Sequence, residues 1–236
     1  MHIHLISSPR NLSTALMYSF AQREDMRAVD EAFYAYYLAS SGADHPGRDE
    51  VLASQPQDVD GVLKLLDRTD DRQHLFIKGM AHHCEGIPVE KLARMTSIFY
   101  IRDPKRIIAS FAEVIHNPTL RDIGLRTSVE LLDNIRRAGG TCLVLDSDDL
   151  LADPQGMLTA LCDALGIGFD ERMLTWNAGP RPEDGVWAKH WYANVHRSTG
   201  FAKQTTSDRE LAQHLRPLYE EALPYYRRLH AQRIIA

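Results

Sequence analysis

Short apolar runs alternate with amphipathic segments along the chain. The apolar runs predict five strands, at residues 2–6, 27–29, 75–78, 97–101 and 141–145. Between them, apolar residues recur every three or four positions, as at Leu12, Leu16 and Phe20, which predicts helices. The predicted helices cover residues 13–22, 32–39, 59–67, 88–94 and 128–137, and two more begin at Pro104 and Pro154. Residues 40–57 are rich in Gly, Asp, Ser and Pro and predict a long, mobile loop.

Proline and glycine mark several helix ends. Asp103-Pro104 fits an N-cap residue followed by proline in the first helical turn. Gly166 fits the residue that ends the helix after Pro154. A helical tail is predicted from residue 208, with breaks at Pro217 and Pro224. The alternation of strands and helices predicts an α/β domain over residues 1–236, in which helices cover both faces of a parallel sheet of about five strands. The helical tail begins at about residue 207.

Composition narrows the class of protein. The chain has 236 residues, of which 44% are hydrophobic and 25% charged, which is enough for one sizeable core. A net charge of −5 gives no overall basic field for nucleic acid or a membrane surface. Cys84, Cys142 and Cys162 form no CxxC pair or zinc spacing, which favours a reduced, cytoplasmic protein without disulfides. No signal peptide is expected at the start, and no apolar run approaches the ~20 residues of a membrane span.

Polar residues follow each predicted strand, where the carboxyl ends of parallel strands meet at one edge of a sheet. Two of these segments begin a helix beside an arginine, Arg10 in the first and Arg102 in the second. A helix start offers free N–H groups and the positive end of a dipole, so it suits an anion. The sequence therefore predicts a ligand with at least two separate anionic groups. The simpler alternative is that loops are polar in any protein.

The first of these segments, residues 8–16, is not a Walker A loop. It lacks GxxxxGK[ST], and no lysine precedes Ser13 and Thr14. An arginine and two hydroxyls at a helix start can hold a sulfate-like or phosphate-like group without a metal, since arginine donates bidentate bonds to such oxygens. A metal-dependent nucleotide kinase on a related fold is an alternative, and the missing lysine argues against it.

These motifs resemble those of the sulfotransferases that use 3′-phosphoadenosine 5′-phosphosulfate (PAPS). The family's first loop reads PK(or R)xGT(or S)T, to which Pro9-Arg10-Asn11-Leu12-Ser13-Thr14 is similar, with leucine at the glycine position. The family's RDPxxxxxS motif matches Arg102-Asp103-Pro104 and Ser110. Residues 145–154 and 161–166 resemble its "YEDL…DP…LxxFLG" segment, and 196–201 its late glycine loop. The resemblance implies a P-loop-like sheet, PAPS as co-substrate and no metal.

The resemblance also implies roles for individual residues. The first loop would bind the 5′-phosphosulfate, through Arg10, Asn11, Leu12, Ser13 and Thr14. Arg102 and Ser110 would bind the 3′-phosphate. The late loop would close over the nucleotide, through Arg197, Ser198, Thr199 and Gly200.

Sulfuryl transfer needs a base for the acceptor proton and a cation for the leaving oxygen. Arg10 is our first choice for the cation, and Lys78 at the end of the third strand is the second. For the base we favour a histidine, since histidine titrates near neutrality, and of the pair we favour His82 over His83. Glu31 is the other candidate for the base. The alternatives are an exposed strand-end lysine, a surface histidine pair and a glutamate that only favours a helix dipole. A metal at His82, His83 and Cys84 is not expected, because adjacent residues rarely face one ion.

The acceptor is expected to be a small, uncharged or weakly polar molecule with a hydroxyl or amine. Its pocket is expected among residues 40–57, 116–123 and 179–196. Trp187, Trp191 and Tyr192 either line that pocket or pack in the core. A module that binds a nucleotide without catalysis is a further alternative, in which the pocket persists and the base does not act.

Overall fold

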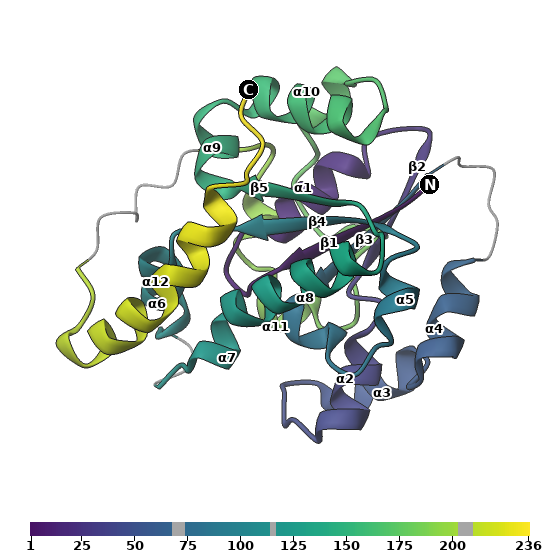
Figure 1. Cartoon of the computed structure of the whole chain (residues 1–236). Coiled ribbons are helices and arrows are strands. Elements are labelled where there is room, and N and C mark those ends of the chain that lie inside the picture. Colours follow the sequence, from purple (N-terminus) through teal and green to yellow (C-terminus); the bar gives the residue numbers. More distant parts are fainter. Residues whose placement is uncertain (68–73, 114–116, 203–209) are drawn as a thin grey trace.

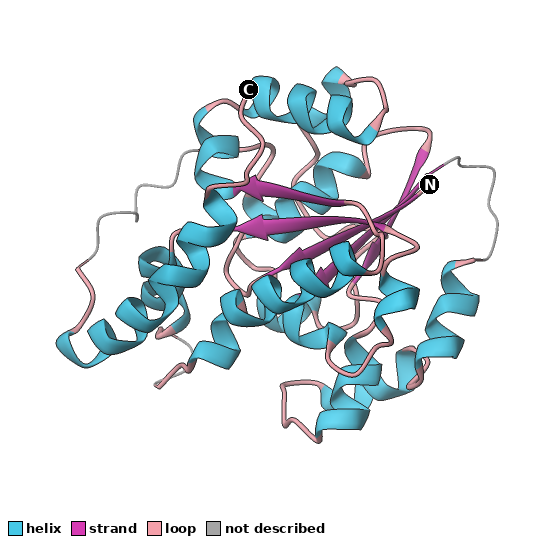
Figure 2. Ribbon diagram, in the orientation of Figure 1, coloured by secondary structure: helices cyan, strands magenta, loops and turns pink. Residues whose placement is uncertain are grey.

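Five parallel strands form the centre of the structure (Figures 1 and 2). The computed structural model describes residues 1–67, 74–113, 117–202 and 210–236. The strands are β1 (His2–Ser7), β2 (Met26–Asp30), β3 (His74–Met80), β4 (Thr96–Ile101) and β5 (Cys142–Asp146). Their order is β2-β3-β1-β4-β5, and Leu5 in the central strand pairs with Lys78 and Ile98. This arrangement confirms the predicted parallel α/β fold.

Helices cover both faces of this sheet (Figure 1). Side chains alternate between the faces of a strand. Ile3 and Leu5 of β1 therefore pack in one cluster with helices α1, α9 and α10, whereas Phe99 and Ile101 of β4 pack in another with α4, α5, α6, α8 and α12. Fully burying such a side chain contributes roughly 1.5–3 kcal/mol, so the two clusters fix the helices on the sheet. The helices are α1 (Ser13–Phe20), α2 (Tyr34–Ser41), α3 (Arg48–Ser54), α4 (Val59–Leu66), α5 (Val89–Leu92), α6 (Pro104–Phe111), α7 (Leu120–Ile123), α8 (Leu125–Arg137), α9 (Ser147–Ala152), α10 (Pro154–Leu165), α11 (Ala188–Trp191) and α12 (Arg216–His230). Short 3₁₀ helices lie at η1 (Ala81–Cys84), η2 (Glu171–Leu174), η3 (Val195–Arg197) and η5 (Gln213–Leu215).

The prediction of a long loop over residues 40–57 is wrong in its middle part. Helix α3 occupies it, and its Val51 is fully buried against α2. The side chain of Gln55 accepts a hydrogen bond from the Ala35 N–H at 3.1 Å and donates one to the Glu31 carbonyl at 3.2 Å. A single apolar anchor and one amide side chain thus fix a segment whose composition is that of a loop.

The predicted break at Pro224 is also wrong. Helix α12 begins at Arg216, with Pro217 in its first turn, in agreement with a break at Pro217, and then continues through Pro224 to His230. Ala222 and Leu229, on either side of that proline, are fully buried in the same cluster, so packing keeps both halves in one helix. The predicted start of the tail, at residues 207–208, lies outside the described residues. None of the described helices is both long and apolar enough to cross a bilayer.

Candidate active site

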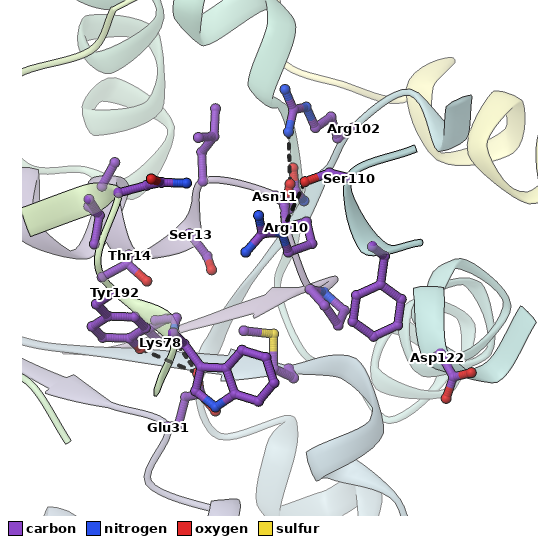
Figure 3. A pocket seen from close by; sticks show the side chains of 18 of the residues that line it. Arg10, Asn11, Ser13, Thr14, Glu31, Lys78, Arg102, Ser110, Asp122 and Tyr192 are labelled. Carbon is purple, nitrogen blue, oxygen red and sulfur yellow. Dashed lines mark hydrogen bonds and ion pairs between the residues drawn. The ribbon is translucent and has the colours of Figure 1, made fainter. Parts of the chain in front are cut away.

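A cavity of about 690 Å³ opens at the carboxyl ends of the strands (Figure 3). It brings together the first loop, Glu31 after β2, Lys78 in β3, His82 after β3 and Arg102 after β4. These groups come from four strands, so the predicted meeting of polar strand ends is confirmed there. At the end of the fifth strand, β5, the Asp146 carboxylate instead caps α9 by accepting from the Asp148 N–H at 2.7 Å.

The first loop has an unusual backbone. Arg10 has φ of 61° and Leu12 has φ of 59°, both in the left-handed region that favours glycine. Leu12 is the N-cap residue of α1 and makes no side-chain cap, so the N–H groups at this helix start are available to an anion. The Asn11 amide donates to the Tyr100 carbonyl and fastens the loop to β4. Ser13 and Thr14 begin the helix and line the cavity.

The second motif lies directly against the first loop. Asp103 caps α6 by accepting from the Lys105 N–H at 2.8 Å, as predicted. The buried Arg102 donates from Nη1 to the Arg10 carbonyl at 2.8 Å, and Arg10 Nε donates to Ser110 Oγ at 3.0 Å (Figure 3). Two motifs about a hundred positions apart in sequence therefore share one wall of the cavity.

Only some of the residues predicted to bind the nucleotide from the late loop, residues 196–201, line the cavity. Ser198 and Gly200 line the cavity. Arg197 is exposed and donates to the Asn194 side chain at 2.5 Å, and the Thr199 carbonyl accepts from the Trp176 N–H at 3.1 Å.

Lys78 is fully buried at the floor of the cavity, so the alternative of an exposed strand-end lysine is wrong. Its Nζ donates to Asp30 Oδ1 at 2.9 Å, to Glu31 Oε1, and to the Tyr192 hydroxyl at 2.7 Å. Figure 3 shows Lys78 beside Glu31 and Tyr192. Burial by itself would lower the pKa of Lys78, but Asp30 and Glu31 more than offset this and raise that pKa. An ammonium has three N–H groups, and here each has an acceptor.

Glu31 lies between Lys78 and a histidine. Its carboxylate pairs with Lys78 on one side, and its Oε2 is 3.8 Å from His83 Nδ1 on the other. The backbone of Glu31 has φ of 39°, which is strained for a residue with a side chain. Burial raises the pKa of the Glu31 carboxyl, and Lys78 opposes that rise. Strained backbone and a raised carboxyl pKa in a cavity are both typical of functional positions.

His82 and His83 also border the cavity, at 9% and 2% exposure, so the alternative of a surface pair is wrong. The His83 ring stacks on Tyr34 with centroids 4.8 Å apart, and the His82 ring meets Tyr37 edge-on at 4.8 Å. Burial lowers the pKa of His82 to about 3 and that of His83 well below its ordinary value. Both imidazoles are therefore uncharged near neutral pH.

Comparison with known proteins decides the family. The model of the "Sulfotransferase domain" family matches residues 1–233. The chain belongs to the sulfotransferase domain family. It is 40% and 38% identical over 226 residues to the branched-chain-amino-acid aminotransferase-like proteins 1 and 2 of Arabidopsis thaliana. Those matches cover 95% of this chain but 40% of each relative, so the chain spans about two fifths of their length.

Solved structures share the fold of this sulfotransferase domain. The sulfotransferase domain of the Synechococcus PCC 7002 olefin synthase matches with a TM-score of 0.63 at 20% identity, over 97% of this chain and 94% of that one. A sulfotransferase from Alicyclobacillus acidocaldarius matches with a TM-score of 0.59 at 13% identity, over 99% and 96%.

The three aromatic residues Trp187, Trp191 and Tyr192 divide between the two predicted roles, packing in the core and lining the cavity. Trp187 is buried in a core cluster at 2% exposure, whereas Trp191 and Tyr192 line the cavity. The contact between Tyr192 and Lys78 spans 114 positions, and no motif in the sequence signals it. Within the described ranges, no three His, Cys, Asp or Glu side chains are placed to hold a metal ion.

Proposed function

We propose that this domain is a PAPS-dependent sulfotransferase that transfers a sulfuryl group to a hydroxyl or amine of a small molecule. The observation that carries the proposal is the shared wall of the first loop and the RDP motif. There, Arg102 bonds the backbone of Arg10, and Arg10 bonds Ser110. Two arginines at two helix starts in one cavity suit a ligand with two separate anionic groups.

The donor would lie across this wall. Arg10, Ser13, Thr14 and the backbone of Asn11 and Leu12 would hold its 5′-phosphosulfate, and Arg102 with Ser110 its 3′-phosphate. Ser198 and Gly200 border the same cavity and would contact the nucleotide from the other side. Arg10 is the cation that we assign to the leaving oxygen, because every N–H group of Lys78 already has an acceptor.

Glu31 is our assignment for the base. The acceptor oxygen or nitrogen attacks sulfur, the bond from sulfur to the bridging phosphate oxygen breaks, and the acceptor proton passes to the Glu31 carboxylate. A base is most effective when its pKa approaches the working pH. Burial raises the pKa of the Glu31 carboxyl, whereas it lowers those of His82 and His83 and so weakens them as bases. The two imidazoles would instead orient the acceptor by hydrogen bonds as neutral groups.

The names of the Arabidopsis relatives raise transamination as another activity. An aminotransferase needs a lysine that can lose its charge and form a Schiff base with its cofactor. Lys78 is the one lysine among the described residues that line the cavity, and two carboxylates hold it charged. This cavity therefore favours sulfuryl transfer, and the activity in those names fits better in the part of the relatives that the chain does not span.

Titration calorimetry tests the proposal. We expect tight binding of 3′-phosphoadenosine 5′-phosphate (PAP) without added metal, and much weaker binding of AMP and of ATP with Mg²⁺. Sulfuryl transfer from PAPS to a panel of small alcohols, phenols and amines then tests catalysis. A preference for ATP with Mg²⁺ would support the kinase alternative, and PAP binding without any transfer would support a non-catalytic module.

A further inference from the structure

The hydroxyl of Tyr192 stands at the centre of the buried charge network. It accepts from Lys78 Nζ at 2.7 Å and from Trp187 Nε1 at 3.2 Å, and it donates to Asp30 Oδ2 at 2.7 Å. Tyr192 is 5% exposed, and its oxygen is 3.5 Å from Glu31 Oε1. The Thr14 side chain of the first loop also hydrogen-bonds this hydroxyl.

This arrangement divides one ammonium between two carboxylates. Asp30 and Glu31 each take one N–H of Lys78, and Tyr192 takes the third. The second oxygen of Asp30 is occupied by the Tyr192 O–H instead of by Lys78. Without that hydroxyl, Asp30 Oδ2 would keep only the Gly185 N–H, at 3.3 Å, as a donor and would lie beside a free N–H of Lys78. The ammonium would then shift toward Asp30 and away from Glu31.

We propose that Tyr192 is a positioning residue for Glu31, which it serves by keeping Lys78 shared between the two carboxylates. The assignment of Glu31 as the base rests on the proposed function, whereas the sharing of Lys78 does not. Tyr192 comes from the segment that leads into the late loop, far in sequence from β2 and β3. This segment would thus complete the catalytic network as well as a wall of the cavity.

Two variants test this in opposite directions. Tyr192→Phe keeps the ring in its aromatic cluster and removes only the hydroxyl. This variant should raise the pKa of Glu31 and so move the acid limb of the kcat–pH profile to higher pH. Near pH 6 it should lower kcat about tenfold, because a hydrogen bond to a charged group is lost. Asp30→Asn should do the reverse and move that limb to lower pH. It leaves Lys78 with one carboxylate and removes a like charge that raises the pKa of Glu31.

Tyr18→Phe is the matched control. Tyr18 is also fully buried, and its hydroxyl donates to a carboxylate, Asp184, at 2.5 Å. Its hydroxyl bonds Asp184 and not Lys78, Asp30 or Glu31, so its loss should leave the kcat–pH profile unchanged. In Asp30→Asn and Tyr18→Phe, PAP should bind within about twofold of the unaltered chain. Equal effects of Tyr192→Phe and Tyr18→Phe, or shifts in one direction for Tyr192→Phe and Asp30→Asn, overturn the proposal.

NMR titration of ¹³C-labelled glutamate carboxyls measures the pKa of Glu31 without any need for activity. It therefore tests the role of Tyr192 separately from the proposed function. The Glu31 resonance, assigned with Glu31→Gln, should titrate at higher pH in Tyr192→Phe and at lower pH in Asp30→Asn. If the unaltered chain transfers no sulfuryl group, the proposed function fails, and these shifts still decide the role of Tyr192. If Tyr192→Phe does not fold while Tyr18→Phe does, the hydroxyl is structural and the proposal is wrong.

Discussion

Burial affects the pKa of a carboxyl and of an imidazole in opposite directions, and this separates the candidate bases. We expect Glu31→Gln to lower kcat by about 10²–10⁴-fold, the usual contribution of a general base. His82→Gln and His83→Gln keep a neutral hydrogen-bonding group and should lower kcat less than tenfold. Steady-state rates at saturating PAPS check this. A loss in His82→Gln that equals the loss in Glu31→Gln would return the base to histidine.

The same assignment fixes the shape of the pH profile. Glu31 must be ionised to accept a proton, and burial raises its pKa, so kcat should rise with pH until that carboxyl is deprotonated. In Glu31→Gln the limb should disappear. His82 stays neutral above about pH 3, so it adds no step in the neutral range. The measurement is kcat from pH 5 to 9 at constant ionic strength.

Arg102 should distinguish ligands by their 3′-phosphate. We expect Arg102→Ala to weaken PAP binding by about 10- to 100-fold, because a charge-assisted hydrogen bond is lost. AMP, which lacks that phosphate, should bind within about threefold of its original affinity. Arg126→Ala is the control, since Arg126 is exposed on α8 and pairs with Glu130. Calorimetry measures the binding of PAP and of AMP to the unaltered chain and to both variants. Equal losses of affinity for PAP and AMP in Arg102→Ala would contradict the role of Arg102 at the 3′-phosphate.

Local motifs and long-range contacts differ in how far the sequence could predict them. Arg102 and Ser110 belong to one strand-to-helix unit, so their spacing alone places both at the same wall of the cavity. The burial of Lys78 was not evident, because a lysine after an apolar run also fits an exposed strand end. Tyr192 was one member of an aromatic cluster, and only the fold brings it to Lys78.

The first loop depends on an unusual backbone conformation as well as on its side chains. Leu12 adopts φ of 59°, which costs a residue with a Cβ about 1–2 kcal/mol. Leu12→Gly removes that strain and part of an apolar contact, so we expect unfolding stability within about 1 kcal/mol of the original and unchanged PAP binding. Leu12→Val adds a β-branched side chain in the same conformation and should lower both. Thermal unfolding compares the stability of the two variants, and calorimetry compares their PAP binding. If Leu12→Val were as stable as Leu12→Gly, the loop would not require a positive φ at residue 12.

Strands were more predictable than the segments between them. The central strands β1, β3 and β4 are mainly apolar runs that are buried on both faces, so their pattern can be read from the sequence alone. Helix α3 depends on Val51 meeting α2, and the continuity of α12 through Pro224 depends on Ala222 and Leu229 meeting the core. Those contacts are tertiary, so composition indicated a loop in one case and a break in the other.

The cavity of the whole molecule has two ends of opposite charge. Arg10, Arg102 and Arg106 line the end that we propose for the donor, and Asp148 pairs with Arg106 there. At the other end, where we propose that the acceptor binds, Asp44 and Asp122 line the cavity together with His45.

The cations of that acceptor end already have partners. Arg121 is paired with Glu85 at 2.6 Å, and Lys78 with Asp30 and Glu31. The donor end therefore attracts anions, whereas the acceptor end repels them.

This polarity predicts how the charge of an acceptor affects its use. Tyramine, 4-ethylphenol and 3-(4-hydroxyphenyl)propionate share a phenol and differ in charge, so kcat/KM for the three at saturating PAPS isolates the effect. We expect the propionate to be at least tenfold poorer than 4-ethylphenol and tyramine to be at least as good, with differences that shrink at high salt. Asp44→Asn removes an exposed carboxylate without disturbing packing and should narrow the gap. A propionate used as well as 4-ethylphenol would mean that the acceptor binds closer to Arg121 than to Asp44 and Asp122.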